Sequence, residues 1–159
     1  MPSSESVQLT LYHGSKVVVN KPEIRPTRRS KDFGQGFYCT KLFQQAEIWA
    51  TRFSNGHVSR YTYSEIPTLS KLIFHDMTEE WLAFITACRT HQPHTYDIVE
   101  GPMADDQVAL TVEQYISGEI SKAAFWELVK FRKTTHQISF HTPDALDTLI
   151  YLDSKEVRR

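Results

Sequence analysis

Two short segments near the N-terminus combine glycines with side chains that could bind a ligand. His13-Gly14-Ser15 follows residues 7–12, where apolar and polar residues alternate as in a half-buried strand. Glycine at a strand end lets the backbone approach a ligand closely, and an imidazole offers a hydrogen-bond donor or an acceptor. The second segment, residues 33–38, has the sequence FGQGFY, with two glycines ahead of an aromatic strand. Alone, each segment is more typical of a structural core, so a binding site is indicated only by their combination.

Several common catalytic and binding motifs are absent from the sequence. The seven histidines are scattered without HExxH spacing, and the two cysteines form no CxxC pair, so neither a metal site nor a disulfide framework is expected. No G-x-S-x-G nucleophile motif occurs. Gly34 and Gly36 precede a strand rather than a helix, so their amides would not converge on a phosphate group. The formal net charge of -1 provides no overall attraction to nucleic acid.

The N-terminal residues and the hydropathy favour a cytoplasmic protein with no membrane partner. Residues 1–7 are polar and lack the apolar core of a signal peptide. No apolar stretch reaches the length of about 18 residues that a membrane-spanning helix needs. A chain of 159 residues, 40% of them hydrophobic, fits one domain with its own core.

The patterns of apolar, capping and turn-forming residues predict short strands interspersed with helices. Strands are expected over residues 7–12, 37–40, 58–63, 71–74, 97–99, 137–141 and 148–152. Helices are expected over residues 42–53, 80–89, 107–116 and 122–132, with a short one at Pro143. Residues 100–106 are expected to form a polar turn. Because strands and helices do not alternate strictly, the expected fold class is α+β.

Five sequence blocks occur in a fixed order: LYHGS, KDFGQGFYCT, QQAEIWA, YDIVEGPMADD and HQISFHT. In these blocks the chain resembles a bacterial family of small ADP-ribosyltransferase-like toxins, mostly known as a domain of unknown function and related to the poly(ADP-ribose) polymerases and diphtheria toxin. The resemblance covers Leu11 to Leu152. It implies one domain over residues 1–159, with an ADP-ribosyltransferase-type split β-sandwich of two small antiparallel sheets and flanking helices. NAD would bind in the cleft as a substrate.

The resemblance assigns roles to residues of the first three blocks. His13 would hydrogen-bond a ribose hydroxyl, and the backbone of Gly14 would hold the nicotinamide carboxamide. Tyr38 and Trp49, a tryptophan where the group has a tyrosine, would stack on the nicotinamide ring. The other expected NAD-binding residues are Ser15, Phe33, Gly36 and Arg29. Arg29 belongs to a basic cluster, residues 28–31, that suits a pyrophosphate but is otherwise typical of a solvated loop.

Gln137 occupies the position at which related enzymes place a glutamate that touches the ribose. Glutamine can hydrogen-bond a ribose hydroxyl, but it supplies no charge to stabilise the cation that forms as nicotinamide leaves. Asp105 and Asp106 are the nearest candidates to supply that charge, and are equally well explained as an acidic pair at a helix N-terminus. Gln137→Glu is expected to raise NAD hydrolysis if the cleft is built as in the charged relatives. The catalytic residues expected are His13, Tyr38 and Gln137.

The resemblance implies an NAD-dependent ADP-ribosyltransferase, a glycosyltransferase that cleaves nicotinamide and transfers ADP-ribose to a macromolecular acceptor. It further implies the toxin of a toxin–antitoxin pair or of a phage-defence system, with a cognate antitoxin as partner. Two alternatives stay open. Gln137 favours a non-catalytic NAD- or ADP-ribose-binding module. A modest basic patch, formed by Lys130, Arg132 and Lys133, is compatible with an RNA-directed phosphotransferase-like enzyme.

Overall fold

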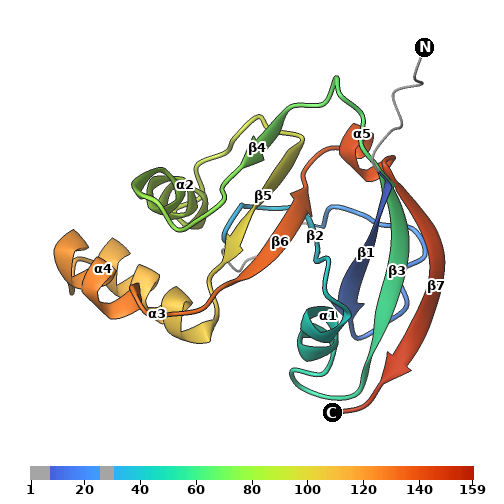
Figure 1. Cartoon of the computed structure of the whole chain (residues 1–159), viewed down its shortest axis with the longest axis horizontal. Coiled ribbons are helices and arrows are strands. Elements are labelled where there is room, and N and C mark those ends of the chain that lie inside the picture. Colours follow the sequence, from blue (N-terminus) through green and yellow to red (C-terminus); the bar gives the residue numbers. More distant parts are fainter. Residues whose placement is uncertain (1–7, 26–30) are drawn as a thin grey trace.

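The computed structural model describes residues 8–25 and 31–159 and shows helices and strands arranged around two β-sheets (Figure 1). The first sheet is antiparallel and has the order β1 (Gln8–Ser15), β3 (Gly56–Ser64), β7 (Leu149–Val157). The second has the order β2 (Phe37–Cys39), β6 (Thr135–Phe140), β5 (Ile98–Met103), β4 (Lys71–Ile73). Within this second sheet β4 and β5 are parallel, and the other pairs are antiparallel.

The two sheets meet where β1 lies beside β2 (Figure 1). The N–H of Tyr12 donates to the carbonyl of Thr40 (2.8 Å), and the N–H of Thr40 donates back to the carbonyl of Tyr12 (2.9 Å). Buried apolar side chains from both sheets, among them Leu11 and Phe37, pack into one cluster at this junction. The two hydrogen bonds between Tyr12 and Thr40 form a β-bridge. This bridge brings the end of β1, residues 13–15, next to the FGQGFY segment.

Helix α1 (Phe43–Ala50) packs against the end of β1 at close range. A Cβ atom on Gly14 would lie 2.0 Å from the carbonyl oxygen of Ala46, so a larger residue would push the helix away from the strand. On the helix side, the small buried side chains of Ala46 and Ala50 permit the same approach. The helix ends at Ala50, before the expected residue 53.

Helices α2 (Glu79–Arg89), α3 (Asp106–Ile116) and α4 (Lys122–Val129) lie together beside the four-stranded sheet, far from the three-stranded one (Figure 1). Each begins at a side-chain cap. The hydroxyl of Thr78 accepts from the N–H of Trp81 (3.1 Å) at the start of α2, and Asp105 and Ser121 cap α3 and α4 in the same way. The short helix α5 (Pro143–Leu146) begins at proline, as expected. Within the described residues, no helix is long and apolar enough to cross a membrane.

The mixture of helices and strands is confirmed, but three expectations about the strands are wrong. The second sheet is not purely antiparallel, because β4 and β5 run parallel. Residues 100–103, expected in a polar turn, continue β5 and pair with β6. Burial of Glu100 is possible there because Lys41 (3.3 Å) and Lys71 (3.6 Å) pair with its carboxylate. Strand β7 extends to Val157, beyond the expected residue 152.

Candidate functional site

Five sequence-predicted residues from four different elements converge on one pocket where the two sheets meet. They are His13 and Gly14 on β1, Tyr38 on β2, Trp49 on α1 and Gln137 on β6. The pocket has a volume of about 310 Å³, and the rest of its lining consists of Lys31, Asp32, Arg52, Arg89 and Met103. We call it the junction pocket.

A second pocket, of about 520 Å³, adjoins the junction pocket and shares His13, Lys31 and Tyr38 with it. Ser15 and Gly36, both expected to contact a ligand, line this second pocket together with loop residues between 17 and 25. We call it the loop pocket. The expected binding residues are therefore distributed over two adjoining spaces, with a histidine, a lysine and a tyrosine in the wall that both share.

His13 is held as a neutral hydrogen-bond acceptor. Its ring stacks on Phe37 (centroids 4.1 Å apart), and its Nδ1 lies 2.6 Å from the carbonyl oxygen of Tyr38. A carbonyl only accepts, so Nδ1 must carry the proton, and Nε2 is left with a lone pair. Burial, more than the nearby charge of Lys31, lowers the pKa of His13 to about 4, although the bond to Tyr38 acts in the opposite direction. At neutral pH the imidazole is uncharged.

The hydroxyl of Tyr38 is committed to the preceding loop, so only its ring remains for a ligand. The hydroxyl donates to the carbonyl of Gly34 (2.5 Å) and accepts from the N–H of Phe33 (3.1 Å). The ammonium of Lys31 lies 4.9 Å from the centre of the Tyr38 ring. The side chain of Phe33 is fully buried in the core beneath the helices and lines neither pocket, so its role is structural.

Two histidines that the sequence analysis left without a role fix the FGQGFY loop. Nε2 of His94 bonds to the carbonyl of Phe33 (2.9 Å), and Nδ1 of His141 bonds to the carbonyl of Gln35 (2.7 Å). Glycine is required at position 36, because a Cβ there would lie 2.7 Å from Nδ1 of His141. Both histidines are far from the loop in sequence, and no spacing pattern could have connected them with it.

Asp32 lies at the centre of a hydrogen-bond network in the wall of the junction pocket. Only 6% of its surface is exposed, and its Oδ1 accepts from Nε (3.1 Å) and Nη2 (2.5 Å) of Arg89. Its Oδ2 accepts from the N–H of Ala104 (2.9 Å) and from Nε2 of Gln137 (3.2 Å). Arg89 also donates to Glu113 (2.9 Å). The sequence analysis missed Asp32 and Arg89. Asp32 lies inside one of the five blocks, but nothing in the sequence connects it with Arg89.

The predictions for the acidic pair, Asp105 and Asp106, and for the basic cluster, residues 28–31, have different outcomes. Asp105 caps α3 by accepting from the N–H of Val108 (2.8 Å), and Asp106 pairs at the surface with Arg52 (2.9 Å). Their interpretation as an acidic pair at a helix N-terminus is confirmed. Arg29 lies outside the described residues. Lys31, from the same cluster, lines both pockets, and burial lowers the pKa of its ammonium group.

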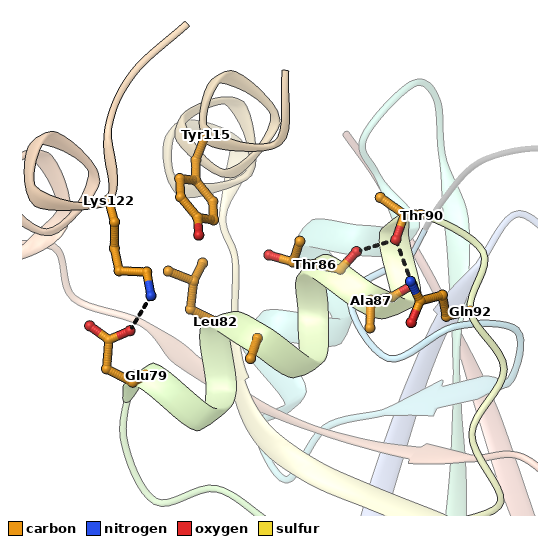
Figure 2. Close-up of a pocket in the computed structure, with 9 residues that line it drawn as sticks. Glu79, Leu82, Thr86, Ala87, Thr90, Gln92, Tyr115 and Lys122 are labelled. Carbon is orange, nitrogen blue, oxygen red and sulfur yellow. Dashed lines mark hydrogen bonds and ion pairs between the residues drawn. The ribbon is translucent and has the colours of Figure 1, made fainter. Parts of the chain in front are cut away.

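A third pocket, of about 350 Å³, lies between α2 and the helices α3 and α4 (Figure 2). One face of α2, including Thr86 and Ala87, forms its floor. Figure 2 shows Lys122 and Glu79 facing each other at one end, where Nζ lies 3.2 Å from a carboxylate oxygen. None of the residues expected to act in a site lines this space. We call it the helix pocket.

The fold and the site together define a mixed α and β protein with a two-part polar pocket where its sheets meet. Residues 9–151 match the model of the family described as "Protein of unknown function (DUF3990)", and the chain belongs to this family. The match includes every described residue of the junction pocket. No curated protein matches the chain. Among the described residues, no group of three His, Cys, Asp or Glu side chains could hold a metal ion.

Proposed function

We propose that the protein is an NAD-dependent ADP-ribosyltransferase that binds NAD across the junction and loop pockets and transfers ADP-ribose to a macromolecular acceptor. The observation that carries this proposal is the convergence of residues from all five sequence blocks on one pocket. The volumes of the two pockets, about 310 and 520 Å³, are in the range of about 300–1,000 Å³ that is typical of small-molecule sites. In this proposal, the paired sheets correspond to an ADP-ribosyltransferase-type split β-sandwich.

The junction pocket suits the nicotinamide and its ribose. In an antiparallel strand, alternate residues direct their backbone N–H and C=O groups to the same edge. The N–H and C=O of Gly14 therefore point to the edge of β1 at which Tyr12 bonds to Thr40. Gly14 lies beyond that bridge, and its backbone would bond the nicotinamide carboxamide. Trp49 and the ring of Tyr38 would stack on the nicotinamide, and Nε2 of His13 would accept a hydrogen bond from a ribose hydroxyl.

The reaction needs a site that binds phosphates and tolerates positive charge on the ribose. The bond between ribose C1′ and the nicotinamide nitrogen breaks, and its electron pair leaves with nicotinamide. A nucleophilic atom of the acceptor then bonds to C1′ and loses its proton. Lys31, in the wall that the two pockets share, would contact the pyrophosphate, and the uncharged imidazole of His13 adds no repulsion to the ribose cation.

Nicotinamide release from NAD, measured by chromatography next to calorimetric NAD binding, tests the proposal directly. Wild-type protein should bind NAD and release nicotinamide, and a cell lysate should gain ADP-ribose adducts, detected by mass spectrometry after brief expression. His13→Ala is the matched inactive control. The protein is not a transferase if it binds NAD without releasing nicotinamide or forming adducts, and the whole proposal is wrong if NAD does not bind.

The toxin role depends on the same chemistry and has its own test. Expression of the wild-type protein should slow bacterial growth, and His13→Ala should restore it. Identical growth with both proteins at matched levels would contradict toxicity. A cognate antitoxin would be a protein whose co-expression restores growth with the wild type.

A non-catalytic NAD- or ADP-ribose-binding module is the second candidate function. One specific observation favours it. Among the described residues, the carboxylate that is hydrogen-bonded to Gln137 is that of Asp32, and its two oxygens together accept four hydrogen bonds. Asp32 therefore has no free lone pair that could reach a ribose cation directly. A protein that binds NAD tightly but releases no nicotinamide would fit this candidate.

A further inference from the structure

We infer that Asp32 is a positioning residue that locks the side-chain amide of Gln137 with its oxygen toward the junction pocket. We call this fixed orientation of the Gln137 amide the lock. Its role in catalysis rests on the proposed function. The lock itself is a property of the free protein, and can be measured without NAD.

The two ends of the Gln137 amide are chemically different, and Asp32 distinguishes between them. Nε2 of Gln137 lies 3.2 Å from Oδ2 of Asp32, and only the NH₂ end can donate to a carboxylate. Only 3% of the surface of Gln137 is exposed, and the residue lines the junction pocket. Its Oε1 accepts no hydrogen bond within residues 8–25 and 31–159. The oxygen is thus turned away from Asp32 and is available to a ligand.

Asp32 is itself fixed from both sides. Arg89 donates twice to Oδ1, and the N–H of Ala104 donates to Oδ2 beside Gln137. These bonds come from α2 and from the segment after β5, so the carboxylate cannot rotate without losing several charge-assisted hydrogen bonds. With Gln137 added, the carboxylate accepts four hydrogen bonds. Asp32 consequently acts on a ligand through Gln137 and not by direct contact.

The orientation of the amide decides which end of its dipole faces the ribose. An oxygen facing the ribose places partial negative charge beside the developing cation and can accept a hydrogen bond from a ribose hydroxyl. A flipped amide would place its positive NH₂ end there. A dipole that is oriented before the reaction needs no reorganisation during it, which is the property that makes such groups effective in catalysis.

The same geometry changes what Gln137→Glu would do. A carboxyl group at position 137 would be buried 3.2 Å from an existing carboxylate. Burial and like charge both favour its protonated form. The protonated oxygen would donate to Asp32, and the other oxygen would face the pocket as an acceptor. This variant should therefore imitate glutamine, and it should not gain the free charge that the sequence analysis expected of it.

The lock is tested first in the free protein. The NH₂ signals of Gln137, identified by their loss in Gln137→Met, should exchange with water at least tenfold faster in Asp32→Asn than in the wild type. Glu113→Gln is the matched control, because it removes another carboxylate from Arg89 without touching Gln137, and should change the exchange less than threefold. Equal exchange in the wild type and Asp32→Asn overturns the lock. If Asp32→Asn does not fold, infrared difference spectra of Gln137→Glu decide, because an ionised Glu side chain at neutral pH also overturns it.

The catalytic consequence is tested by nicotinamide release at saturating NAD. Asp32→Asn and Gln137→Met should each lower kcat at least tenfold with less than a threefold change in NAD affinity. The double variant should be no slower than Gln137→Met alone, because Asp32 acts through Gln137. Gln137→Glu should recover at least tenfold over Gln137→Met. Additive losses would overturn the inference. Absence of release from the wild type would overturn the proposed function instead, and would leave the exchange measurement to decide the lock.

Discussion

The junction pocket and the helix pocket have similar volumes, about 310 and 350 Å³, but they are built differently. The junction pocket takes its walls from both sheets and α1, and it includes the buried pair Asp32 and Arg89. The helix pocket takes its walls from neighbouring helices, and its pair Glu79 and Lys122 is more than half exposed (57% and 54%). Volume alone therefore does not distinguish the two pockets. The buried, fully hydrogen-bonded carboxylate of the junction pocket does.

The buried pair needs an explanation beyond stability. Removing two charges from water costs several kcal/mol per ion, and apolar replacements of the same shape are often as stable or more stable, by about 1–4 kcal/mol. Stability alone therefore does not account for a buried Asp32–Arg89 pair in a pocket wall. The use that we propose for the pair is the orientation of Gln137. The exposed pair of the helix pocket carries no such cost and requires no such explanation.

The largest expected difference between the two pockets is in stability. Asp32→Ala should lower the free energy of unfolding by about 3–5 kcal/mol, because it removes the carboxylate that Arg89 and the N–H of Ala104 bond. Lys122→Ala, which opens the exposed pair of the helix pocket, should change it little. Urea unfolding of both variants measures the contrast. Similar losses for the two variants would remove the distinction between the pockets.

The second contrast is in pH dependence, because His13 lines the junction pocket, and none of the described histidines lines the helix pocket. Burial lowers the pKa of His13 and of His141 to about 4 in the folded protein, from an ordinary value of 6.5. The unfolded chain therefore binds protons at higher pH than the folded one. Stability is complete above about pH 6.5 and falls as the pH drops toward 4, by on the order of 2 kcal/mol per histidine at pH 5.

Unfolding in urea at several pH values between 7.5 and 5 measures this effect. In His13→Asn, the free energy of unfolding should fall less steeply as the pH drops, because only His141 of the two histidines with a lowered pKa remains. A wild-type curve as flat as that of His13→Asn would contradict the buried, neutral state of His13.

The third contrast is in turnover. His13→Ala and Tyr38→Ala should each weaken NAD binding or turnover at least tenfold, about 1.4 kcal/mol in free energy. Gln92→Ala, in the helix pocket, should have no effect. Tyr38→Phe keeps the ring but loses the hydroxyl bonds to the loop, so it separates stacking from loop positioning. Wild-type affinity and turnover in folded His13→Ala and Tyr38→Ala would refute the site assignment, and a loss in Gln92→Ala would move the site.

The parts of the site that could be predicted from sequence are those with a local pattern. His13 and Tyr38 lie in short blocks with glycines, and Gln137 lies in an apolar-alternating segment of another block. The expectation that Gln137 opens this strand is wrong, because β6 begins two residues earlier, at Thr135. Asp32 was missed because its role depends on Arg89, 57 residues away on a helix packed by tertiary contacts. His94 and His141 were missed for the same reason. These two histidines bond to backbone carbonyls of the loop. Every residue has a backbone carbonyl, so no residue type in the sequence indicates such a bond.

The fold shows the same division between local and long-range causes. The start of α2 was predictable because Thr78 is a local cap. Residues 100–103 resembled a turn because Gly101 and Pro102 interrupt the apolar pattern, yet they form a strand. The carbonyl of Pro102 accepts from the indole N–H of Trp81 (3.0 Å), and a Cβ on Gly101 would lie 3.0 Å from that of Phe74. These contacts come from other elements and override the local preference.

The smallest expected effect concerns the floor of the helix pocket. The hydroxyl of Thr86 is buried and has no hydrogen-bond partner in the described part of the chain. Thr86→Val replaces it with a methyl group of similar shape and removes the cost of burying an unpaired polar group. We expect the free energy of unfolding to rise by about 1 kcal/mol, with NAD turnover unchanged. Thr86→Ala, which also removes packing, should not show this gain. If Thr86→Val instead slows turnover, the hydroxyl serves the reaction, and the helix pocket can no longer be separated from the site.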